Sequence, residues 1–344
     1  MPQPQPSSET ISTRGQSGLW HALRTGVASR IALTVAAAIA LAFTGMLWLL
    51  QVSQNAVDSR DRAAQMTLIG GALTSAFDQA GKFAIALAET VARREAIGTA
   101  LAAGDRDALQ RLSQGTYDYL KRQSGVQIFG FHSSDIRYLL RMHKVESFGD
   151  DISGFRAMVV AANKSRRAQT GLEIGIAGIG VRGVAVVDRG SEFVGTMEVG
   201  VDVKPILDLV KASTNADIAV IIVPSMSGVA LDDKMPRFGD LNLAMSTDDD
   251  LFAALLKNGT IRATRDVQIA EQQIGKRAYN MVTQPLVDFS GRLVGMTIAV
   301  TEDKRAASRR VQIELWVIAG CGSILAYVVF AVLFHTALRR RRSA

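Results

Sequence analysis

The sequence predicts an α+β protein in which a long N-terminal helix and two tandem antiparallel-sheet modules lie between two transmembrane helices. Three observations lead to this fold class. Uncharged apolar segments lie near both ends of the 344-residue chain, and each reaches the roughly 20 residues that a membrane-spanning helix requires. An apolar stripe at helical spacing follows the first segment. Short apolar strands then alternate with turn residues over most of the second half of the chain.

The composition and the charge distribution indicate a membrane protein. Hydrophobic residues make up 48% of the chain. The net charge of +7 is concentrated near the ends, in Arg14, Arg24, Arg30 and the arginine run 339–342. Arginines bunched beside apolar segments are typical of membrane-flanking charge, so we expect no nucleic-acid partner. The single cysteine, Cys321, excludes an intrachain disulfide and a thiolate metal site.

The two candidate membrane spans are Ile31–Val52 and Leu315–Leu338, and neither contains a formal charge. The first is too long for the apolar core of a cleaved signal peptide, so we expect an uncleaved anchor. Because arginines precede the first span and follow the second, both termini should lie in the cytoplasm and residues 51–314 on the outer side. The polar residues 1–30 should form a disordered cytoplasmic tail, and residues 339–344 a basic one.

After the first span, residues 53–124 should form a long helix and a helical hairpin. Apolar or small residues recur there at steps of three and four, at Met66, Ile69, Leu73, Phe77, Ala80, Ala84, Leu87 and Val91. We expect this stripe both to cover the sheets of its own chain and to pair with its twin in a homodimer. Asp105 or Asp107 is placed to cap the next helix, from about Ala108 to Ser124.

Residues 125–203 should form a membrane-distal sheet module and residues 204–302 a membrane-proximal one, followed by a juxtamembrane helix at 303–314. The expected strands are 126–132, 137–143, 171–176, 182–187 and 193–201, then 218–223, 260–268, 276–285 and 293–300. Short helices are expected at 153–164 and, capped by Thr247, at 248–257. An internal echo supports two modules, because Val187-Asp188 and Val287-Asp288 each precede a Val-Gly pair at the same spacing.

Arginines in the first module are candidates for holding a carboxylate or another anion, because guanidinium offers a planar fork of donors. They are Arg137, Arg141, Arg156 and Arg182. Alternatively, they pair with nearby carboxylates and hold the sheet together. Those carboxylates are Asp150, Asp151, Glu173 and Glu198. Strand alternation predicts that Arg137, Leu139 and Arg141 share one face of the sheet, with Tyr138 and Leu140 on the other.

The carboxylates have two interpretations of their own. Asp150, Asp151 and Glu173 could hold the ammonium group of an amine or amino acid. Asp150 or Asp151 could equally cap the helix expected near Ser153. With the aromatic residues of the same strands included, the candidate ligand-binding set is Phe129, Phe131, Arg137, Arg141, His143, Asp151, Glu173, Arg182 and Glu198, although such phenylalanines more often belong to a core.

Other motifs do not predict chemistry. His132 and His143 fit no compact metal-ligand spacing, so we expect no metal site. The glycine-rich run 178–183 matches a dinucleotide fingerprint, but a strand follows it where that fold needs a helix. We therefore predict a glycine-rich turn at which backbone approaches backbone or ligand. Since no nucleophile–base arrangement is present, we expect neither an enzyme nor a cofactor.

One series of motifs in the first module resembles a known family. It consists of Phe131-His132, Leu140-Arg-Met-His143, Phe148-Gly-Asp-Asp151, Gly171-Leu-Glu-Ile-Gly175, Arg182-Gly183 and Glu198-Val-Gly200. This series resembles a subfamily of the double Cache (tandem PAS-like) extracytoplasmic sensor domains of bacterial chemoreceptors, sensor kinases and diguanylate cyclases. The resemblance is specific from Phe129 to Gly200, whereas the second module matches only in outline.

The resemblance implies a bacterial inner-membrane sensor that takes part in signal transduction such as chemotaxis, with its central domain in the periplasm. Its expected ligand is a small polar molecule, namely a carboxylate, an amine or an amino acid. Because no output module follows Arg342, we expect the signal to pass through the second span to a separate membrane or cytoplasmic output protein. The alternative is a non-signalling ligand-binding or accessory subunit, such as a remnant receptor or a transporter partner.

Overall fold

The computed structural model describes residues 14–175, 178–227, 235–259, 261–304, 311, 313–318, 320–322, 324 and 328, with side chains from residue 40 onward. The chain divides into two units. One comprises Met1–Asp61 with Gln312–Ala344, and the other is Arg62–Val311. The second unit contains both sheets and is called the head below.

No helix within the described residues is long and apolar enough to cross a membrane. The expected span Leu315–Leu338 lies mostly outside those residues. The expected span Ile31–Val52 is helical, but its side chains are described only from Ala40 onward.

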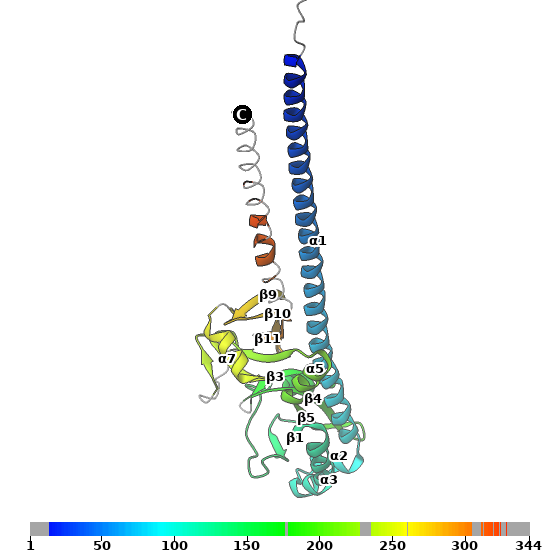
Figure 1. Ribbon diagram of the computed structural model, residues 1–344. Coiled ribbons are helices and arrows are strands. Elements are labelled where there is room, and N and C mark those ends of the chain that lie inside the picture. The colour runs from blue at the N-terminus through cyan, green and yellow to red at the C-terminus, as the bar shows by residue number, and fades with distance from the viewer. Residues whose placement is uncertain are drawn as a thin grey trace, which may run out of the picture. The chain divides into compact units, whose positions relative to one another are not determined.

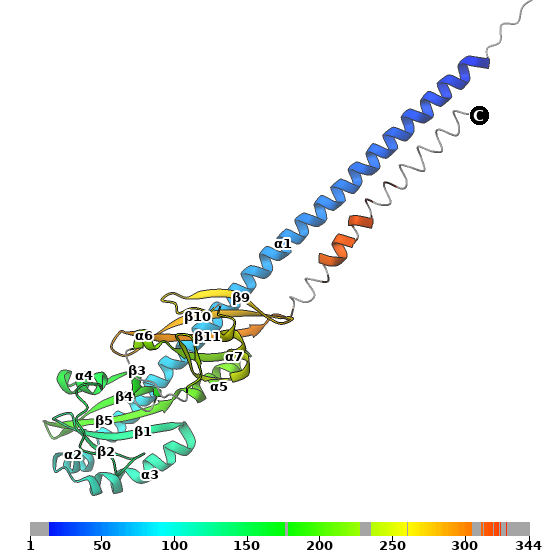
Figure 2. The same cartoon turned by 90° about the vertical axis from the view of Figure 1, so that its left-hand side faces the viewer.

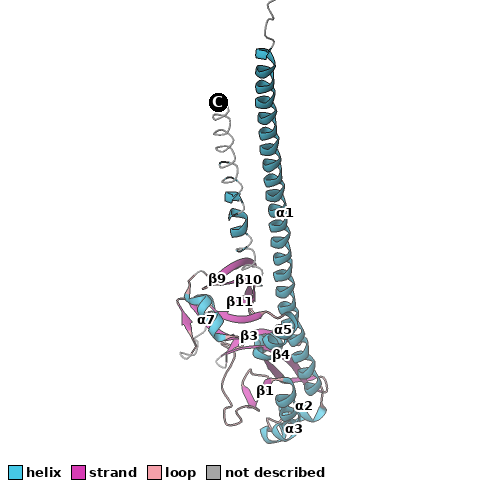
Figure 3. Cartoon of the chain, in the orientation of Figure 1, coloured by secondary structure: helices cyan, strands magenta, loops and turns pink. Residues whose placement is uncertain are grey.

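The described chain begins with one long helix, and shorter helices lie before and between the strands (Figures 1 and 3). The helices are α1 (Arg14–Ala92), α2 (Glu95–Ala102), α3 (Arg106–Ser124), α4 (Ala157–Ser165), α5 (Val203–Thr214), α6 (Pro224–Ser227) and α7 (Asp249–Lys257). The expected apolar stripe is confirmed, because Met66, Ile69, Leu73, Ala84 and Val91 are all buried. Asp105 caps α3 by accepting a hydrogen bond from the backbone NH of Ala108 at 2.9 Å.

The strands form two antiparallel sheets, which confirms the predicted α+β class (Figure 2). The first, distal sheet has the order β2-β1-β5-β4-β3 and the second, proximal sheet the order β7-β8-β6-β11-β10-β9. The distal strands are β1 (Val126–Ser133), β2 (Tyr138–Arg141), β3 (Gln169–Gly175), β4 (Gly178–Arg189) and β5 (Glu192–Asp202). The proximal strands are β6 (Asp217–Ile222), β7 (Arg237–Phe238), β8 (Leu241–Ser246), β9 (Gln268–Ile274), β10 (Arg277–Val287) and β11 (Leu293–Glu302).

The two sheets share one plan, as the internal echo in the sequence suggested. β5 lies between β1 and β4, and β11 lies correspondingly between β6 and β10. Each of these central strands has a glycine at the equivalent place. A Cβ on Gly195 would lie 2.1 Å from the carbonyl oxygen of His132, and one on Gly295 would lie 2.0 Å from that of Ile221. Both glycines are therefore required by the close approach of the neighbouring strand.

Three sequence predictions about the proximal sheet and its helix are corrected. The strand expected at 260–268 lies instead at β9, an edge strand whose exposed and half-buried residues provide no clear apolar alternation. β8 was not predicted at all. Asp248, rather than Thr247, caps α7 by accepting from the backbone NH of Leu251 at 3.0 Å, whereas the Thr247 hydroxyl donates to Asp217.

The helices α1, α2 and α3 cover one face of the distal sheet. Their core residues pack against Phe129, Phe131, Leu140, Met197 and others that point to that face.

The run 178–183 lies in β4 instead of forming the expected turn. It does bring backbone close to backbone, since a Cβ on Gly183 would lie 2.3 Å from the backbone nitrogen of Ile85 in α1.

The two modules are joined by shared packing within the head. Met66, Ile69 and Leu73 of α1 belong to one core cluster that contains residues of both sheets. The turn between β10 and β11 also reaches the distal module. The backbone NH of Phe289 donates to the carbonyl oxygen of Leu172 in β3 at 2.7 Å.

A buried charge cluster beneath α4 is the candidate functional site

The face of the distal sheet opposite α1 carries polar residues from four neighbouring strands. His132 pairs in register with Thr196, and Glu198 pairs with Val184. Arg182 of β4 and Glu173 of β3 also lie on this face, because residues opposite one another in an antiparallel pair point to the same side. The segment before α4 and α4 itself pack on this face through Ile152, Met158, Val159 and Ala162.

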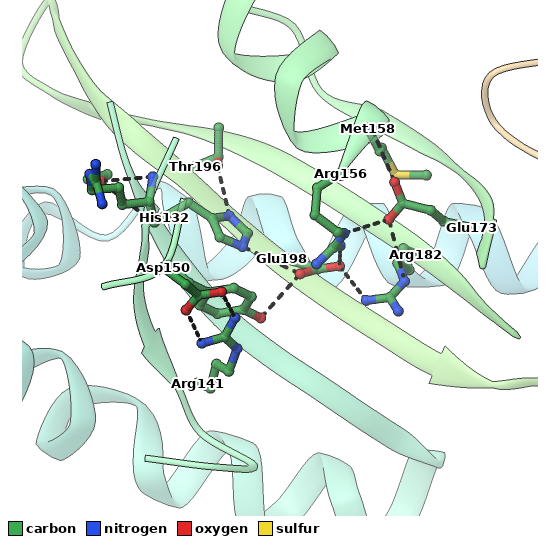
Figure 4. A network of polar contacts seen from close by, with 12 residues as sticks. His132, Arg141, Asp150, Arg156, Met158, Glu173, Arg182, Thr196 and Glu198 are labelled. Atoms are coloured by element: carbon green, nitrogen blue, oxygen red, sulfur yellow. Dashed lines mark hydrogen bonds and ion pairs between the residues drawn. The ribbon is translucent and has the colours of Figure 1, made fainter. Parts of the chain in front are cut away.

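Two arginines and two glutamates meet at the centre of this face, and we call them the charge cluster: Arg156, Glu173, Arg182 and Glu198 (Figure 4). All four are buried. Nε of Arg156 donates to Glu173 at 2.9 Å, and its Nη2 donates to Oε1 of Glu198. Nη1 of Arg182 donates to the same Glu198 oxygen at 2.8 Å. The cluster is therefore neutral as a whole, with each carboxylate facing at least one guanidinium.

The electrostatics of the cluster keep its carboxylate charged. Burial raises the pKa of Glu198, but attraction to Arg156 and Arg182 outweighs burial and holds the pKa well below its usual value. Burial lowers the pKa of Arg156, and the two glutamates more than compensate, so this guanidinium stays protonated. The ion pair between Arg156 and Glu198 therefore persists throughout the neutral pH range.

His132 lies beside the cluster as a neutral side chain. Its Nδ1 lies 3.0 Å from the hydroxyl of Thr196 and its Nε2 lies 3.5 Å from Oε2 of Glu198. Burial lowers the pKa of His132, although the neighbouring Glu198 opposes this shift. Within the described part of the chain, the His132 Nε2 and the Arg182 Nε have no hydrogen-bond partner. Buried polar atoms without a partner are uncommon, so each is a possible contact for a ligand.

The alternation predicted for β2 is wrong. His132 pairs with Tyr138 but Phe131 pairs with Leu140, so β2 has one extra residue and the register shifts. This bulge places Tyr138 and Arg141 on the same face. The Arg141 guanidinium stacks on the Tyr138 ring at 3.7 Å, and the Tyr138 hydroxyl donates to Glu198 at 3.3 Å.

We call residues 150–165, which include α4, the covering segment. An ion pair between Arg141 of β2 and Asp150 links this segment to the sheet. Two parallel hydrogen bonds of 2.7 and 2.6 Å join the guanidinium to the carboxylate, and this hydrogen bonding lowers the pKa of Asp150. Asp151 is exposed and accepts from the backbone NH of Ser153 at 2.9 Å, but α4 begins only at Ala157, so neither aspartate caps it.

The structure brings together only part of the predicted set. Glu173, Arg182 and Glu198 meet in the charge cluster, and Arg141 lies at its edge. Phe129 and Phe131 point to the opposite face, into the core with α3. Three others are exposed: Arg137, which donates to the Gly149 carbonyl and pairs with Asp135, as well as His143 and Asp151.

Three residues of the site were left out of the predicted set, namely Arg156, His132 and Tyr138. Arg156 was weighed as an anion ligand, but it follows a turn-rich segment that has no periodicity to show which way it points. His132 and Tyr138 stand among the apolar residues of β1 and β2, where a core position is the usual expectation. The signal for His132 was its position, since it alternates with Phe131 and so had to face the side away from the helices.

A family profile described as a double sensory domain of two-component sensor kinases matches residues 60–300. No curated protein sequence matches the chain. Among solved structures, the periplasmic domain of Vibrio cholerae LuxQ is 12% identical, with 69% of this chain and 99% of that one covered and a TM-score of 0.41.

Two further solved structures show similar values. The sensor domain of the V. cholerae histidine kinase DctB is 8% identical, covering 70% of this chain and 96% of its own, with a TM-score of 0.41. The sensory domain of the Campylobacter jejuni chemoreceptor Tlp3, solved with isoleucine bound, is 9% identical, covering 71% and 92%, also with a TM-score of 0.41. The profile spans most of the sequence, including both sheets, and the chain therefore belongs to the double Cache family of sensory domains.

Proposed function

We propose that the chain is a bacterial inner-membrane sensor, not an enzyme, and that its periplasmic head binds a small polar ligand at the charge cluster. The observation that carries this proposal is the cluster itself. Four charged side chains are buried on the sheet face beneath α4. Beside them, Nε of Arg182 and Nε2 of His132 make no hydrogen bond within the described residues, although a glutamate oxygen lies 3.7 and 3.5 Å away. Replacing buried ion pairs by apolar residues is often neutral or stabilising, so such a cluster suits recognition better than stability.

The charge balance of the cluster supports one class of ligand. Arg156 and Arg182 are matched by Glu173 and Glu198. A ligand with only a carboxylate would displace a glutamate from its arginines and leave that glutamate buried without a partner. A ligand with both a carboxylate and an ammonium group can pair its carboxylate with an arginine and its ammonium with the displaced glutamate, so no buried charge is left without a partner. The site therefore favours an amino acid or a related zwitterion over a simple carboxylate or amine.

The covering segment provides the conformational change. Arg156 and the backbone NH of Met158, which donates to Glu173 at 3.3 Å, both come from this segment. The ion pairs that close the segment over the sheet are those that a ligand would replace. A ligand that replaces these ion pairs would therefore bind with different affinities when the covering segment is closed over the sheet and when it is open. Such a difference in affinity is what a ligand needs to shift a conformational equilibrium.

The link between the modules supports a route for the signal. Glu173 of the cluster follows Leu172, whose carbonyl accepts from the Phe289 NH. The Phe289 ring packs with the α4 residues against the distal sheet. The same turn is held by Asp288, which accepts hydrogen bonds from Ser290 and Arg292. A movement of β3 or α4 would thus reach β11, the strand that precedes the second expected span, and through it the output protein.

The ligand proposal is tested by thermal unfolding of the full chain in the presence of amino acids, monocarboxylates and monoamines. At about 100 times its Kd, a ligand stabilises the native state by about 2.7 kcal/mol. For a head of this size, that corresponds to a rise in Tm of roughly 5–11 °C. We expect such a shift from an amino acid and not from its matched monocarboxylate or monoamine.

Two arginines of β4 provide a matched pair of variants. Arg182→Lys keeps the charge but loses the forked donor, and it should weaken binding at least about tenfold. Arg189→Lys alters an exposed arginine of the same strand, which pairs with exposed Glu192, and should change nothing. Equal effects of the two variants would place the ligand elsewhere.

Transmission is tested separately with Phe289→Ala. This variant should bind ligand normally but lose the ligand-induced change in hydrogen exchange of β11. Phe155→Ala, which removes an exposed phenylalanine of the covering segment, is the control. If β11 of the Phe289 variant still responds, the signal does not pass through this turn.

We also propose that the sensor is a homodimer that pairs along α1. Leu68 and Phe83 of α1 remain 74% and 40% exposed in the single chain, which supports a further partner for this helix. Disulfide crosslinking of Leu68→Cys between copies in the membrane tests the pairing, with a cysteine at exposed Asp107 of α3 as the control.

A further inference from the structure

A cavity lies in the head, lined by other residues than those of the charge cluster. It has a volume of about 350 Å³ and opens where the two modules meet α1. Its walls include Leu73 and Phe77 of α1, Leu172 of β3, Gln284 and Leu286 of β10, and Thr297 of β11. This volume is at the small end of the range for ligand pockets, which is about 300–1,000 Å³.

The lining differs in chemistry from the charge cluster. Its described residues include no charged side chain and are mostly apolar, with the Gln284 amide, the Thr297 hydroxyl and the Thr74 hydroxyl as their polar groups. The Thr74 hydroxyl is already used, because it donates to the Gly70 carbonyl at 3.1 Å. Among the described residues, neither the Gln284 amide nor the Thr297 hydroxyl is joined by a hydrogen bond to another group, although Thr297 is only 4% exposed. Both are therefore available to a ligand.

Gly70 leaves room for the amide of Gln284 against α1. A Cβ at this position would lie 2.7 Å from Nε2 of Gln284, so a larger residue there would displace the amide. Gln284 pairs in register with Thr297, which places both polar groups on the same face of the sheet. A single hydrogen-bonding group of a ligand can therefore reach both.

We propose that this cavity, the junction pocket, binds a small uncharged molecule with an apolar body and one amide, carbonyl or hydroxyl group. A charged ligand is excluded because the lining offers no counter-ion, and burying an unpaired charge is strongly unfavourable. The apolar body packs against Leu73, Phe77 and Leu286, while the polar group exchanges hydrogen bonds with Gln284 and Thr297. The sensor thus has two sites of opposite chemistry, one for a charged ligand and one for a neutral ligand.

The place of the pocket gives its ligand an influence on signalling, and this consequence rests on the proposed route through Phe289. Leu172 lines the pocket with its side chain and accepts the Phe289 NH with its carbonyl oxygen. A molecule packed against Leu172 and β10 fixes β3 relative to the turn. Occupancy of the junction pocket would therefore alter how strongly the two modules are coupled.

The test uses hexanamide as the probe and hexanoate as its nearly isosteric charged control. Thr74 lines the pocket and is exposed, so a cysteine there reports occupancy through its rate of reaction with a maleimide. Thr67→Cys is the matched control, because Thr67 is also exposed on α1 and donates to the carbonyl of the residue four positions earlier, as Thr74 does. Both variants are made in the full chain with Cys321→Ser.

We expect hexanamide to slow the labelling of Thr74→Cys several-fold, with no effect on Thr67→Cys and none from hexanoate. Adding Thr297→Val, which keeps the shape but removes the hydroxyl, should weaken this protection about fivefold. Arg189→Lys, an exposed substitution in β4, should leave the protection unchanged. No ligand of the charge cluster is present in this experiment, so failure of the charge-cluster proposal does not affect the result. Three results would overturn the proposal: no protection up to the solubility limit, equal protection of both cysteines, and equal protection by hexanoate.

Discussion

Glu198→Gln is the sharpest test of the charge cluster, because the substitution keeps the shape of the side chain and removes only its charge. Glu198 is 0% exposed, and one of its oxygens accepts from both Arg156 and Arg182. Without that charge, two buried guanidinium groups face only Glu173, which lies 2.9 Å from one and 3.7 Å from the other. Removing one partner from a buried ion pair costs about 3–5 kcal/mol.

This cost is a large share of the stability of a typical domain, about 5–15 kcal/mol. It corresponds to a fall in Tm of roughly 6–20 °C for a unit of this size. Differential scanning calorimetry of the full chain measures the shift. Hydrogen-exchange mass spectrometry of β5 shows whether the distal sheet is the part that opens.

Glu192→Gln is the matched control for the same strand, since Glu192 is exposed and pairs with exposed Arg189. Its effect should stay within about 0.5 kcal/mol. The double variant Glu198→Gln/Arg182→Met should lose less stability than the sum of the single variants, by about 0.5–3 kcal/mol, because one unmatched guanidinium is removed. If Glu198→Gln costs no more than Glu192→Gln, the four charges are not coupled as the geometry indicates.

Two further outcomes follow from the same structure. Because burial lowers the pKa of His132 from its ordinary value of about 6.5, the unfolded chain binds a proton in acid that the folded chain does not. The stability contributed by neutral His132 should therefore be complete above about pH 6.5 and fall below it. His132→Gln should lose less stability than the wild type when the pH of the unfolding experiment is lowered from about 6.5 to about 5. Gly183→Ala should lower the Tm by several degrees, because its Cβ would lie 2.3 Å from the Ile85 nitrogen of α1, whereas Gly180→Ala in the same strand meets nothing nearer than 3.6 Å; similar melting of the two variants would mean that α1 gives way freely.

Much of the fold could be predicted because apolar residues recur at the regular spacing of helices and strands. The apolar stripe of α1 has a period set by the helix, and strands such as β1 and β5 have buried runs between turn residues. β9 escaped prediction because an exposed edge strand needs no such pattern. The orientation of residues in β2 was mispredicted for another reason. One extra residue in the strand pairing places Tyr138 on the same face as Arg141, and strict alternation does not reveal such a bulge.

The class of the fold and the family could be predicted from the sequence, which also named Glu173, Arg182 and Glu198 among nine candidate site residues. The packing of the chain was needed to show that Arg156 completes the cluster and that Phe129 and Phe131 face away from it. It alone also brought Gln284 against Gly70 of α1, more than 200 residues earlier in the chain. The physical reason is that hydrophobic periodicity records which side of an element is buried, whereas the partner on that side depends on strand register and on how distant segments pack.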